Sequence, residues 1–425
     1  MEKIALLFSG QGAQYIGMGK MLYDNFSVAK ETFEEASSVL GFELEKLCFE
    51  GDNNELTKTE NAQPALLTNS VAAFRVYMNE IGIAPAFVAG HSLGEFSALA
   101  CTGAINFSDA VKIVRMRGLF MQEASALGVG SMAAITGIDR KIIEEECAKF
   151  SKNDNIVVVS NYNSPEQTVI SGHREAVYEL GELLAQKGAR NIPLKVSAPF
   201  HSPLMNQAAV KLGEEMQKYK YNNFRWPVIS NVTALPYSEP EKITSNMTMQ
   251  MTSPVQWVNS MKFLQDQGVS VVVELGAGTV LRNLMKKNSS TIKAYSYDNS
   301  EDAKELKDIV ASDEFLSQPD TKFRSTVITK SLAVAVCTRN RNWDNDEYQK
   351  GVVEPYRKIQ ELQRKLEEEK KEPTADEMRQ ALDMLVTVFN TKKTPVNEQM
   401  ERFNEIFEAT GTGDLFVDFI QGIKS

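Results

Sequence analysis

Short apolar runs alternate with amphipathic stretches from residue 1 to about residue 300. A short apolar run is typical of a buried strand, and apolar residues repeated at intervals of three and four positions are typical of a helix packed on one face. The strand candidates are Ile4–Phe8, Ala86–Ala89, Val228–Ser230 and Val269–Val273. Strands that alternate with helices in this way predict an α/β fold.

Residues 130–197 follow an order of their own. The expected elements are an apolar run Met132–Thr136, a helix Arg140–Phe150, strands Ile156–Ser160 and Gln167–Ser171, a helix Glu175–Gln186 and a strand Asn191–Val196. This β-α-β-β-α-β order predicts a ferredoxin-like unit inserted into a larger domain. Two domains that face each other form a cleft, where ligand sites are commonly found.

The pattern changes again beyond about residue 305. Tyr356–Lys371 is strongly charged, and its apolar residues form one narrow stripe: Ile359, Leu362 and Leu366. A second helical pattern after Pro373 carries an apolar face of Met378, Leu382, Leu385 and Phe389. Thr374 or Asp376 is suited to cap this helix, and we interpret the charged stretch as a solvated helix face rather than a docking surface.

Three parts are therefore predicted. The main domain covers 1–128 and 198–304, the ferredoxin-like subdomain covers 129–197, and a mainly helical extension of unassigned role covers 305–425.

Composition narrows the class of protein. Of the 425 residues 43% are apolar, which is ordinary for a globular protein, and we find neither a signal sequence nor an apolar run long enough for a membrane span. The net charge of −10 and the lack of a long basic block argue against nucleic acid as a partner. The cysteines, with no C-x-x-C pair among them, are expected to be buried free thiols in a cytoplasmic protein: Cys48, Cys101, Cys147 and Cys337.

One glycine-containing loop superficially resembles a dinucleotide-binding loop. Glu274-Leu275-Gly276-Ala277-Gly278 follows a strand candidate and precedes a helical stretch, Val280–Lys287. Leucine stands at position 281, where the third glycine of such a loop belongs. We therefore expect a turn that closes the last strand of the sheet.

A candidate nucleophile lies in Gly90-His91-Ser92-Leu93-Gly94-Glu95. This is the G-x-S-x-G pattern, in which a serine stands on a sharp turn between a strand and a helix. At a helix N-terminus, free backbone N–H groups favour the oxyanion of acyl transfer. The alternative is a serine that only caps the helix, and the motif does not say whether an acyl group would pass to water or to another acceptor.

A serine nucleophile needs a base, and the chain has three histidines. His91 is expected to point away from Ser92, and His173 to lie on the surface of the insert. His201 lies between Pro199 and Pro203, where the chain re-enters the main domain, and is favoured as the base. The alternative is a structural histidine.

Arg117 is the third candidate. In the helical stretch 109–124 it is the one polar residue of a stripe formed by positions 110, 113, 114, 117, 121 and 124. A buried guanidinium requires a partner. That partner is either an internal Asp or Glu or a carboxylate carried by the substrate, which arginine binds through two hydrogen bonds.

Seven motifs together resemble the malonyl-CoA:acyl carrier protein transacylase family, including the freestanding acyltransferases that serve polyketide synthases. They are Ser9-Gly10-Gln11-Gly12-Ala13-Gln14, Asn61-Ala62-Gln63-Pro64-Ala65, Gly90-His91-Ser92-Leu93-Gly94-Glu95, Met116-Arg117-Gly118, Phe200-His201-Ser202, Ser253-Pro254-Val255-Gln256-Trp257 and Val273-Glu274-Leu275-Gly276. The resemblance covers roughly residues 1–300. It implies an α/β-hydrolase-like large domain with a parallel sheet and a ferredoxin-like insert.

The resemblance also implies a role for each site residue. Ser92 is the nucleophile and His201 the general base and acid, while the main-chain carbonyl of Gln250 orients the histidine. The backbone N–H groups of Gln11 and Leu93 form the oxyanion hole.

Three further side chains belong to the substrate site in this family. Arg117 holds the malonyl carboxylate, and Gln63 lines the site. Phe200 favours malonyl over methylmalonyl, because its ring leaves little room for a branch.

The expected function is transfer of malonyl from malonyl-CoA to an acyl carrier protein, with no metal and no bound cofactor. The extension has no counterpart in the minimal transacylase, which favours a polyketide role over a fatty acid role and leaves docking to a synthase as a possible additional function. One alternative is an acyl hydrolase that clears stalled carrier proteins, to which a buried Arg117 would be of no use. The other is a non-catalytic docking protein.

Overall fold

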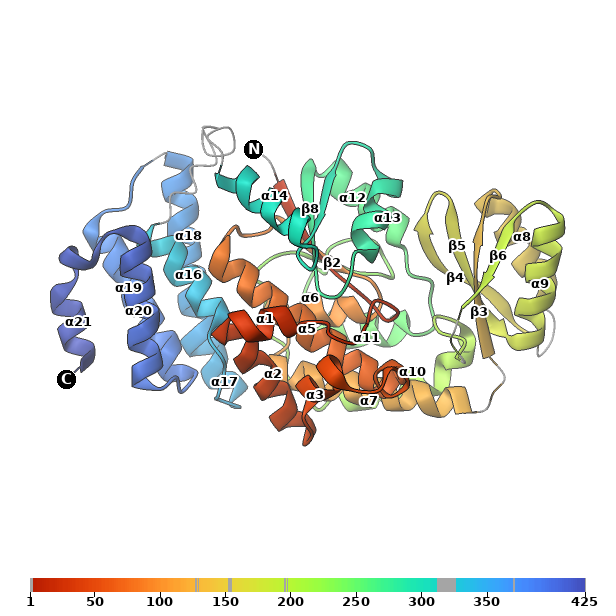
Figure 1. The fold of residues 1–425 in the computed structure, drawn as a ribbon, viewed down its shortest axis with the longest axis horizontal. Coiled ribbons are helices and arrows are strands. Elements are labelled where there is room, and N and C mark those ends of the chain that lie inside the picture. Colours follow the sequence, from red (N-terminus) through yellow and green to blue (C-terminus); the bar gives the residue numbers. More distant parts are fainter. Residues whose placement is uncertain are drawn as a thin grey trace.

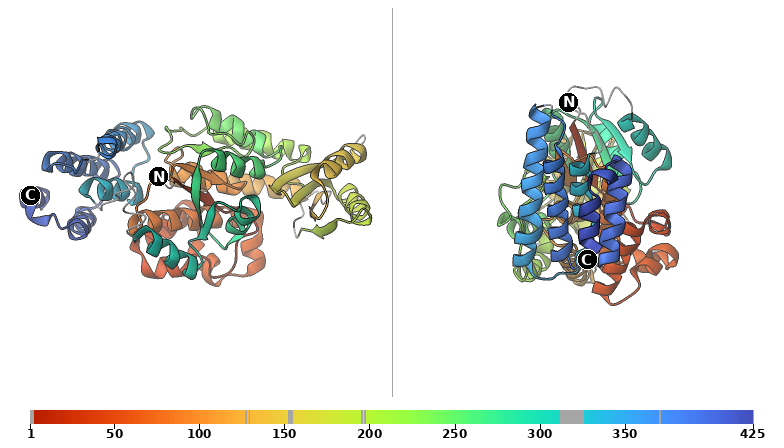
Figure 2. Two further views of the ribbon diagram at one scale, coloured as in Figure 1. Left: turned by 90° about the horizontal axis from the view of Figure 1, so that it is seen from above. Right: turned by 90° about the vertical axis from the view of Figure 1, so that its left-hand side faces the viewer.

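Three parts of the chain lie in a row along the long axis of the computed structural model (Figures 1 and 2). The structure describes residues 3–424 apart from 127, 129, 152–154, 195, 197, 312–325 and 370. An antiparallel sheet with two helices lies at one end, a parallel sheet covered by helices lies in the middle, and the C-terminal helices lie at the other end.

The central sheet has five parallel strands. In spatial order they are β7 (Val228–Ile229), β2 (Phe87–Gly90), β1 (Lys3–Phe8), β8 (Val269–Leu275) and β9 (Lys293–Ser296). Phe8 lies opposite Gly90 on one side and Leu275 on the other, so the carboxyl ends of three strands meet at one edge. The predicted α/β fold with a parallel sheet is therefore confirmed.

Side chains of β1 alternate between two cores. Leu6 and Phe8 belong to the large core on one face of the sheet, whereas Ala5 and Leu7 belong to a smaller core on the other face. A parallel sheet buried on both faces explains why its strands are continuous apolar runs in the sequence. The helical elements of this part are α1 (Lys20–Asn25), α2 (Ser27–Leu40), α3 (Leu44–Glu50), α4 (Asn53–Thr57), α5 (Thr59–Glu80), α6 (Leu93–Cys101), α7 (Phe107–Ala126), the 3-10 turn η1 (Pro203–Met205), α10 (Asn206–Met216), α11 (Lys242–Gln250), α12 (Trp257–Asp266), α13 (Val280–Asn288) and α14 (Ser300–Ala311).

The second sheet is antiparallel and has the spatial order β4-β5-β3-β6. Its elements are β3 (Gly130–Thr136), α8 (Arg140–Phe150), β4 (Val157–Ser164), β5 (Gln167–His173), α9 (Arg174–Gln186) and β6 (Arg190–Pro193). Their order along the chain agrees with the β-α-β-β-α-β pattern read from the sequence. The last strand ends at Pro193, before the predicted Val196, and positions 195 and 197 lie outside the described residues.

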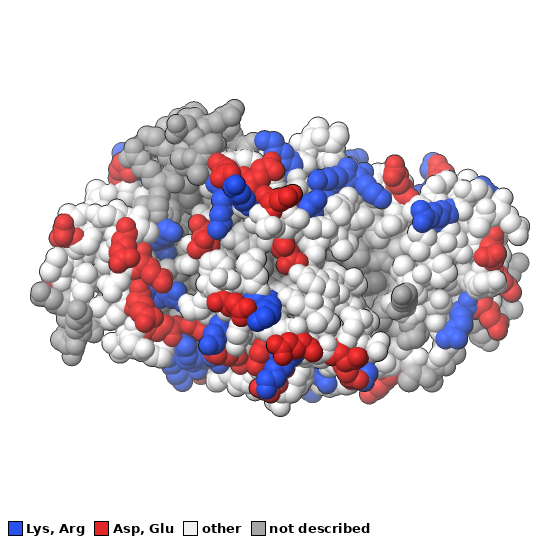
Figure 3. All heavy atoms as spheres, viewed as in Figure 1, with Lys and Arg blue, Asp and Glu red and all other residues white. Residues whose placement is uncertain are grey.

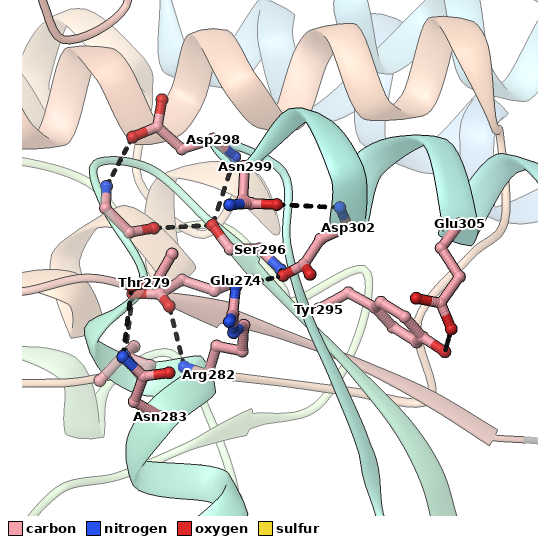
Figure 4. Close-up of polar contacts among 12 residues, drawn as sticks. Glu274, Thr279, Arg282, Asn283, Tyr295, Ser296, Asp298, Asn299, Asp302 and Glu305 are labelled. Atoms are coloured by element: carbon pink, nitrogen blue, oxygen red, sulfur yellow. Dashed lines mark hydrogen bonds and ion pairs between the residues drawn. The ribbon is translucent and has the colours of Figure 1, made fainter.

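The loop after β8 differs from its prediction. It leads into α13 and then into a further strand, β9, so the expectation that this turn closes the last strand of the sheet is wrong. Figure 4 shows how the added strand is fixed: the carboxylate of Asp302 accepts hydrogen bonds from Arg282 (2.7 Å) and from the backbone N–H of Ser296 (2.8 Å). This one side chain of α14 thereby holds α13 and β9 together.

The N-terminus of α13 is occupied by a carboxylate of the protein itself. Glu274 accepts hydrogen bonds from the backbone N–H groups of Leu281 (3.0 Å) and Arg282 (2.8 Å), and burial raises the pKa of Glu274 to about 7. A dinucleotide-binding fold places a phosphate at this position. The Glu274 carboxylate therefore explains physically why the loop is not a phosphate site.

The C-terminal extension is helical, as expected. Its elements are α16 (Val327–Cys337), α17 (Asn345–Tyr348), the π-helical turn η2 (Gln349–Val353), α18 (Glu354–Glu369), α19 (Ala375–Thr391), α20 (Val396–Thr410), the 3-10 turn η3 (Gly413–Leu415) and α21 (Val417–Lys424). Thr374 is the N-cap of α19, where its side chain and that of Glu377 form a reciprocal capping box.

Helix α16 was not predicted. Nearly every residue in it is buried, because it lies between α5 of the central part and α19 and α20 of the extension. Because the helix is buried on all sides, it has no polar face. The sequence therefore lacks the regular alternation of apolar and polar positions by which a helix is predicted. The large core runs without interruption from β1 through α5 and α16 to Phe419. The domain boundary at residue 304 thus remains a prediction, and the core crosses it.

The surface carries charges of both signs. On the face seen in Figure 3, Lys and Arg side chains are interspersed with Asp and Glu. Several form exposed pairs one helical turn apart, such as Lys20–Asp24 and Lys58–Glu55, and such pairs contribute at most about 1 kcal/mol each. Among the described residues, no helix is both long enough and apolar enough to cross a membrane.

The continuous core predicts that α16 is essential for stability. Val334→Asp places a charge at a side chain that is 4% exposed, so we expect the free energy of unfolding to fall by about 3–5 kcal/mol. Val396→Asp is the matched control, since Val396 is 59% exposed and its change should stay within about 0.5 kcal/mol. Urea unfolding followed by circular dichroism measures both. Equal losses in the two variants would contradict the prediction.

Candidate active site

Ser92 lies on a sharp turn between β2 and α6. Its backbone has φ 52° and ψ −104°, a strained conformation for a residue with a side chain. A Cβ atom on Gly90 would lie 1.9 Å from the carbonyl carbon of Gly94, and one on Gly94 would lie 2.0 Å from the carbonyl oxygen of Phe8. Only glycine fits at both positions, which is why the motif needs them.

His201 reaches Ser92 from the loop that leads into η1. Its Nε2 lies 2.8 Å from Ser92 Oγ, and its Nδ1 lies 2.7 Å from the main-chain oxygen of Gln250. A carbonyl oxygen only accepts hydrogen bonds, so Nδ1 carries the proton and Nε2 presents its lone pair to the serine. The structure therefore brings together the three groups that the sequence singled out as nucleophile, base and orienting carbonyl.

The ring of His201 is neutral. Burial and, secondly, the positive charge of Arg117 lower the pKa of His201 to about 3, and its exposed fraction is 4%. A neutral imidazole with a free lone pair can accept the serine proton at physiological pH.

The other two histidines have different surroundings. His91 Nε2 pairs with Asn163 Oδ1 at 2.9 Å, facing the antiparallel sheet. His173 is half-buried in that sheet, where its Nδ1 accepts a hydrogen bond from the backbone of Ile156. Neither histidine has a hydrogen bond to Ser92.

Arg117 points its guanidinium at the serine from α7. Its partners are Gln63 Oε1 (2.9 Å), Gln250 Oε1 (3.1 Å) and Ser92 Oγ (3.3 Å), all uncharged. Its exposed fraction is 1%, and burial lowers the pKa of Arg117 to about 10. Within the described ranges, no Asp or Glu forms an ion pair with it, but the carboxylate of Glu95, which shares Gln250 with Arg117, acts on its charge at longer range. A positive charge held beside a nucleophile with no carboxylate in direct contact fits a negatively charged acyl group.

Close packing of α5 against α7 sets the position of Arg117 and Gln63. A Cβ on Gly118 would lie 2.6 Å from Glu60 Cα, so glycine allows the two helices to touch. Pro64 lacks an N–H and leaves the carbonyl of Glu60 without its helical partner. Arg115 donates to that carbonyl at 2.7 Å instead.

The backbone N–H groups of Gln11 and Leu93 face no protein acceptor. Leu93 is the first residue of α6, Gln11 lies in the loop after β1, and in the described part of the chain neither N–H donates a hydrogen bond. Gly10 brings that loop against the turn, because a Cβ there would lie 2.4 Å from His91 O. Both groups are thus free to donate to a substrate oxygen.

Phe200 immediately precedes the histidine. Its side chain is 8% exposed and packs into the large core. The ring is therefore held firmly next to the base.

The sequence did not indicate what holds Ser92 in its strained conformation. Asn231 Oδ1 accepts from the backbone N–H of Ser92 (2.7 Å), and Gln250 Nε2 donates to the backbone oxygen of Ser92 (2.9 Å). Asn231 also donates to Gly90 O at 2.6 Å. We call these two side chains the Ser92 clamp.

Glu95 contacts both residues of the Ser92 clamp. Its fully buried carboxylate accepts from Gln250 Nε2 (2.8 Å), from the backbone N–H of Asn231 (3.2 Å) and from the hydroxyl of Tyr237 (2.5 Å). Burial raises the pKa of Glu95 to about 7. The available signal was Glu95 itself, an acid on an otherwise apolar helix, because an acidic residue there requires buried partners.

Known proteins share this fold and this set of motifs. Residues 5–307 match the family model described as an acyl transferase domain. A malonyl CoA-acyl carrier protein transacylase of Bacillus subtilis is 40% identical over 400 residues, covering 94% of this chain and 99% of the relative. The enzyme of that name from Escherichia coli K12 is 44% identical over 295 residues, which cover 69% of this chain and 95% of the relative.

One solved structure extends the comparison to a complex. It contains a malonyl-transacylase bound to its type II polyketide synthase acyl-carrier protein, with 40% identity and a TM-score of 0.69 over 71% of this chain and 97% of that one. The match to the Bacillus subtilis relative extends well into the C-terminal extension, whereas the Escherichia coli relative matches a shorter part of the chain. On its fold, its motifs and these similarities, the chain belongs to the malonyl-CoA:acyl carrier protein transacylase family.

Proposed function

We propose that the chain transfers a malonyl group from malonyl-CoA to the phosphopantetheine thiol of an acyl carrier protein, through an ester on Ser92. The observation that carries the proposal is the Arg117 guanidinium, which is buried, lies 3.3 Å from Ser92 Oγ and forms no ion pair with any described Asp or Glu. A hydrolase of uncharged acyl chains has no use for such a charge.

In the first half-reaction, His201 Nε2 takes the proton of Ser92 Oγ as the oxygen attacks the thioester carbonyl. The tetrahedral oxyanion accepts hydrogen bonds from the N–H groups of Gln11 and Leu93. When the intermediate collapses, the bond to sulfur breaks and coenzyme A leaves as a thiol with the proton from His201.

In the second half-reaction, the carrier thiol gives its proton to His201 and attacks the malonyl ester. The same two N–H groups stabilise the second oxyanion, and Ser92 leaves with the proton from His201. Arg117 holds the malonyl carboxylate through both halves. No step of this mechanism calls for a metal or a bound cofactor, and malonyl-CoA is a substrate.

Phe200 is proposed to favour malonyl over methylmalonyl. A methyl branch next to the reacting carbonyl would meet a ring that is packed into the core and cannot easily move. One methyl group discriminates by about 1–3 kcal/mol in such a pocket. The selection is therefore a preference.

The proposal also covers the fold, the carrier protein and the location. The central part is proposed to be α/β-hydrolase-like, because Ser92 lies on a turn between a strand and a helix. The carrier protein is taken to belong to polyketide synthesis, since one similar structure is a complex with such a carrier. A freestanding enzyme fits the Bacillus subtilis relative, which this chain covers to 99% of its length. A cytoplasmic location agrees with four buried cysteines that form no disulfide.

Docking to a synthase is proposed only for the far end of the extension. Leu415 and Val417 are 60% and 50% exposed there, next to buried Phe416. Two adjoining apolar side chains in solvent are suited to a protein contact.

The function predicts a stable acyl-enzyme. Incubation with malonyl-CoA should load about one malonyl group per chain on Ser92, and added carrier protein should remove it as malonyl-carrier protein, both measured by intact-protein mass spectrometry. Ser92→Ala should lower loading by more than about a thousandfold. Rapid release of free malonate without transfer would favour the hydrolase, and no loading at all would favour a docking protein.

Arg117 should distinguish charged from uncharged acyl groups. For Arg117→Ala we expect kcat/KM for malonyl loading to fall roughly tenfold to a hundredfold, the effect of losing charge-assisted hydrogen bonds. Loading from acetyl-CoA, which lacks the carboxylate, serves as the internal control and should change much less. Equal losses for the two substrates would make Arg117 a structural residue.

The pH dependence of loading should come from Glu95 and not from His201. The pKa of His201 lies near 3, below its ordinary 6.5, so the base stays neutral throughout the range from about pH 5 to pH 8. Protonation of Glu95 below its pKa of about 7 weakens the Ser92 clamp, so kcat/KM should fall as pH drops through 7. Glu95→Gln should remove this inflection; an unchanged midpoint in the variant would assign it to another group.

A further inference from the structure

A cavity of about 40 Å³ lies where the central part meets the C-terminal extension. Its walls come from α5, from the segment joining α6 to α7, and from the ends of α16 and α19. Three cationic side chains line it: Arg75, Arg225 and Lys392. One water molecule needs about 10–15 Å³ by the same measure, so the cavity has room for a small ion but not for a nucleotide.

Arg75 shares the carboxylate of Glu35 with a second arginine. Its Nη1 lies 3.5 Å from Glu35 Oε2, and the same oxygen lies 4.0 Å from Nε of Arg339. Both Arg75 and Glu35 are buried. The carboxylate of Glu35 therefore faces two guanidinium groups and acts on Lys392 only at longer range.

Arg225 and Lys392 have only uncharged partners. Arg225 donates to Cys101 O (3.4 Å) and to the hydroxyl of Tyr348 (3.2 Å), and its buried Nε has no partner. Lys392, 2% exposed, donates to the main-chain oxygens of Ala335 (2.8 Å) and Thr338 (2.7 Å). Across the residues that the structure describes, neither cation forms an ion pair.

The carbonyl oxygens that Arg225 and Lys392 contact offset only part of a positive charge. Cys101, Ala335 and Thr338 lie at the C-termini of α6 and α16, where the helix dipole supplies about half of a negative charge. Burial and the nearby charges of Arg225 and Arg75 lower the pKa of Lys392 well below its ordinary value, and an anion bound beside it would favour the charged form. The junction thus holds two basic side chains, Arg225 and Lys392, that form no ion pair with a described residue.

We propose that this cavity is a binding site for a small dianionic oxyanion, with inorganic phosphate as its ligand, held by Arg225 and Lys392 with Arg75 behind them. The two cations come from different parts of the molecule: Arg225 follows α10 in the central part, and Lys392 is the C-cap of α19 in the extension. A phosphate bound to both links the extension to the acyltransferase part. The site is separate from Ser92 and does not depend on the proposed function.

Equilibrium dialysis of the full chain against radiolabelled phosphate tests the site. We expect saturable binding of one phosphate per chain, and a melting temperature that rises with phosphate more than with chloride at matched ionic strength. Lys392→Met keeps the length of the side chain and removes its charge. It should weaken phosphate binding about tenfold or more, the effect of losing one charge-assisted hydrogen bond.

Two controls keep the test decisive. Lys393→Met changes the exposed neighbouring lysine and should leave binding unchanged. Arg225→Gln provides a second variant in case Lys392→Met is misfolded, as judged by circular dichroism. Absence of saturable binding, or equal binding by wild type and both site variants, would overturn the proposal. Competition by coenzyme A would also overturn it, since the cavity is too small for a phosphate that is attached to a nucleotide.

Discussion

The burial of the Arg117 charge is the constraint on which the rest of the site depends. A guanidinium removed from water destabilises the fold unless its hydrogen bonds are made. Gln63 and Gln250 accept two of these bonds with neutral oxygens, whereas Nε has no partner among the described residues. The close contact of α5 with α7 at Gly118 and the Arg115 bond to Glu60 O follow from the same need. In the proposed function, the malonyl carboxylate supplies the directly bound negative charge that these neutral partners lack.

Elements that depend on residues close together in the sequence were predicted correctly. The strand before Ser92, the helix after it, and the β-α-β-β-α-β order of residues 130–197 each follow from apolar periodicity and turn residues within a short window. Helix α16 gave no such signal because it is buried on all sides, and β9 was hidden by a loop that resembles the end of a sheet. Ser92, His201 and Arg117 were singled out by the turn motif, the junction loop and the apolar stripe, and the family resemblance then implied their roles.

The sequence did not indicate the residues that hold Ser92 in place, because they come from distant segments of the chain. Asn231 and Gln250 lie more than a hundred positions from Ser92, yet they hold both of its backbone groups. Glu95 is part of the recognised motif, but its partners come from the loop after β7 and from α11. The extension is similar: its continuity with the main core becomes visible only in three dimensions. It is thus better understood as a structural part of the enzyme than as an appended module.

Gln250 contacts both the residue proposed to bind the malonyl carboxylate and the residues proposed to transfer the proton. Its carbonyl orients His201, and its side chain contacts both Ser92 and Arg117. The Arg117 charge is also one of the causes that depress the pKa of His201. A malonyl carboxylate that neutralises this charge must therefore raise the basicity of the imidazole by linkage. In the proposed mechanism, substrate binding would thus strengthen the base that acts on it, and an acyl group without a carboxylate would meet a weaker catalyst even where it fits the pocket.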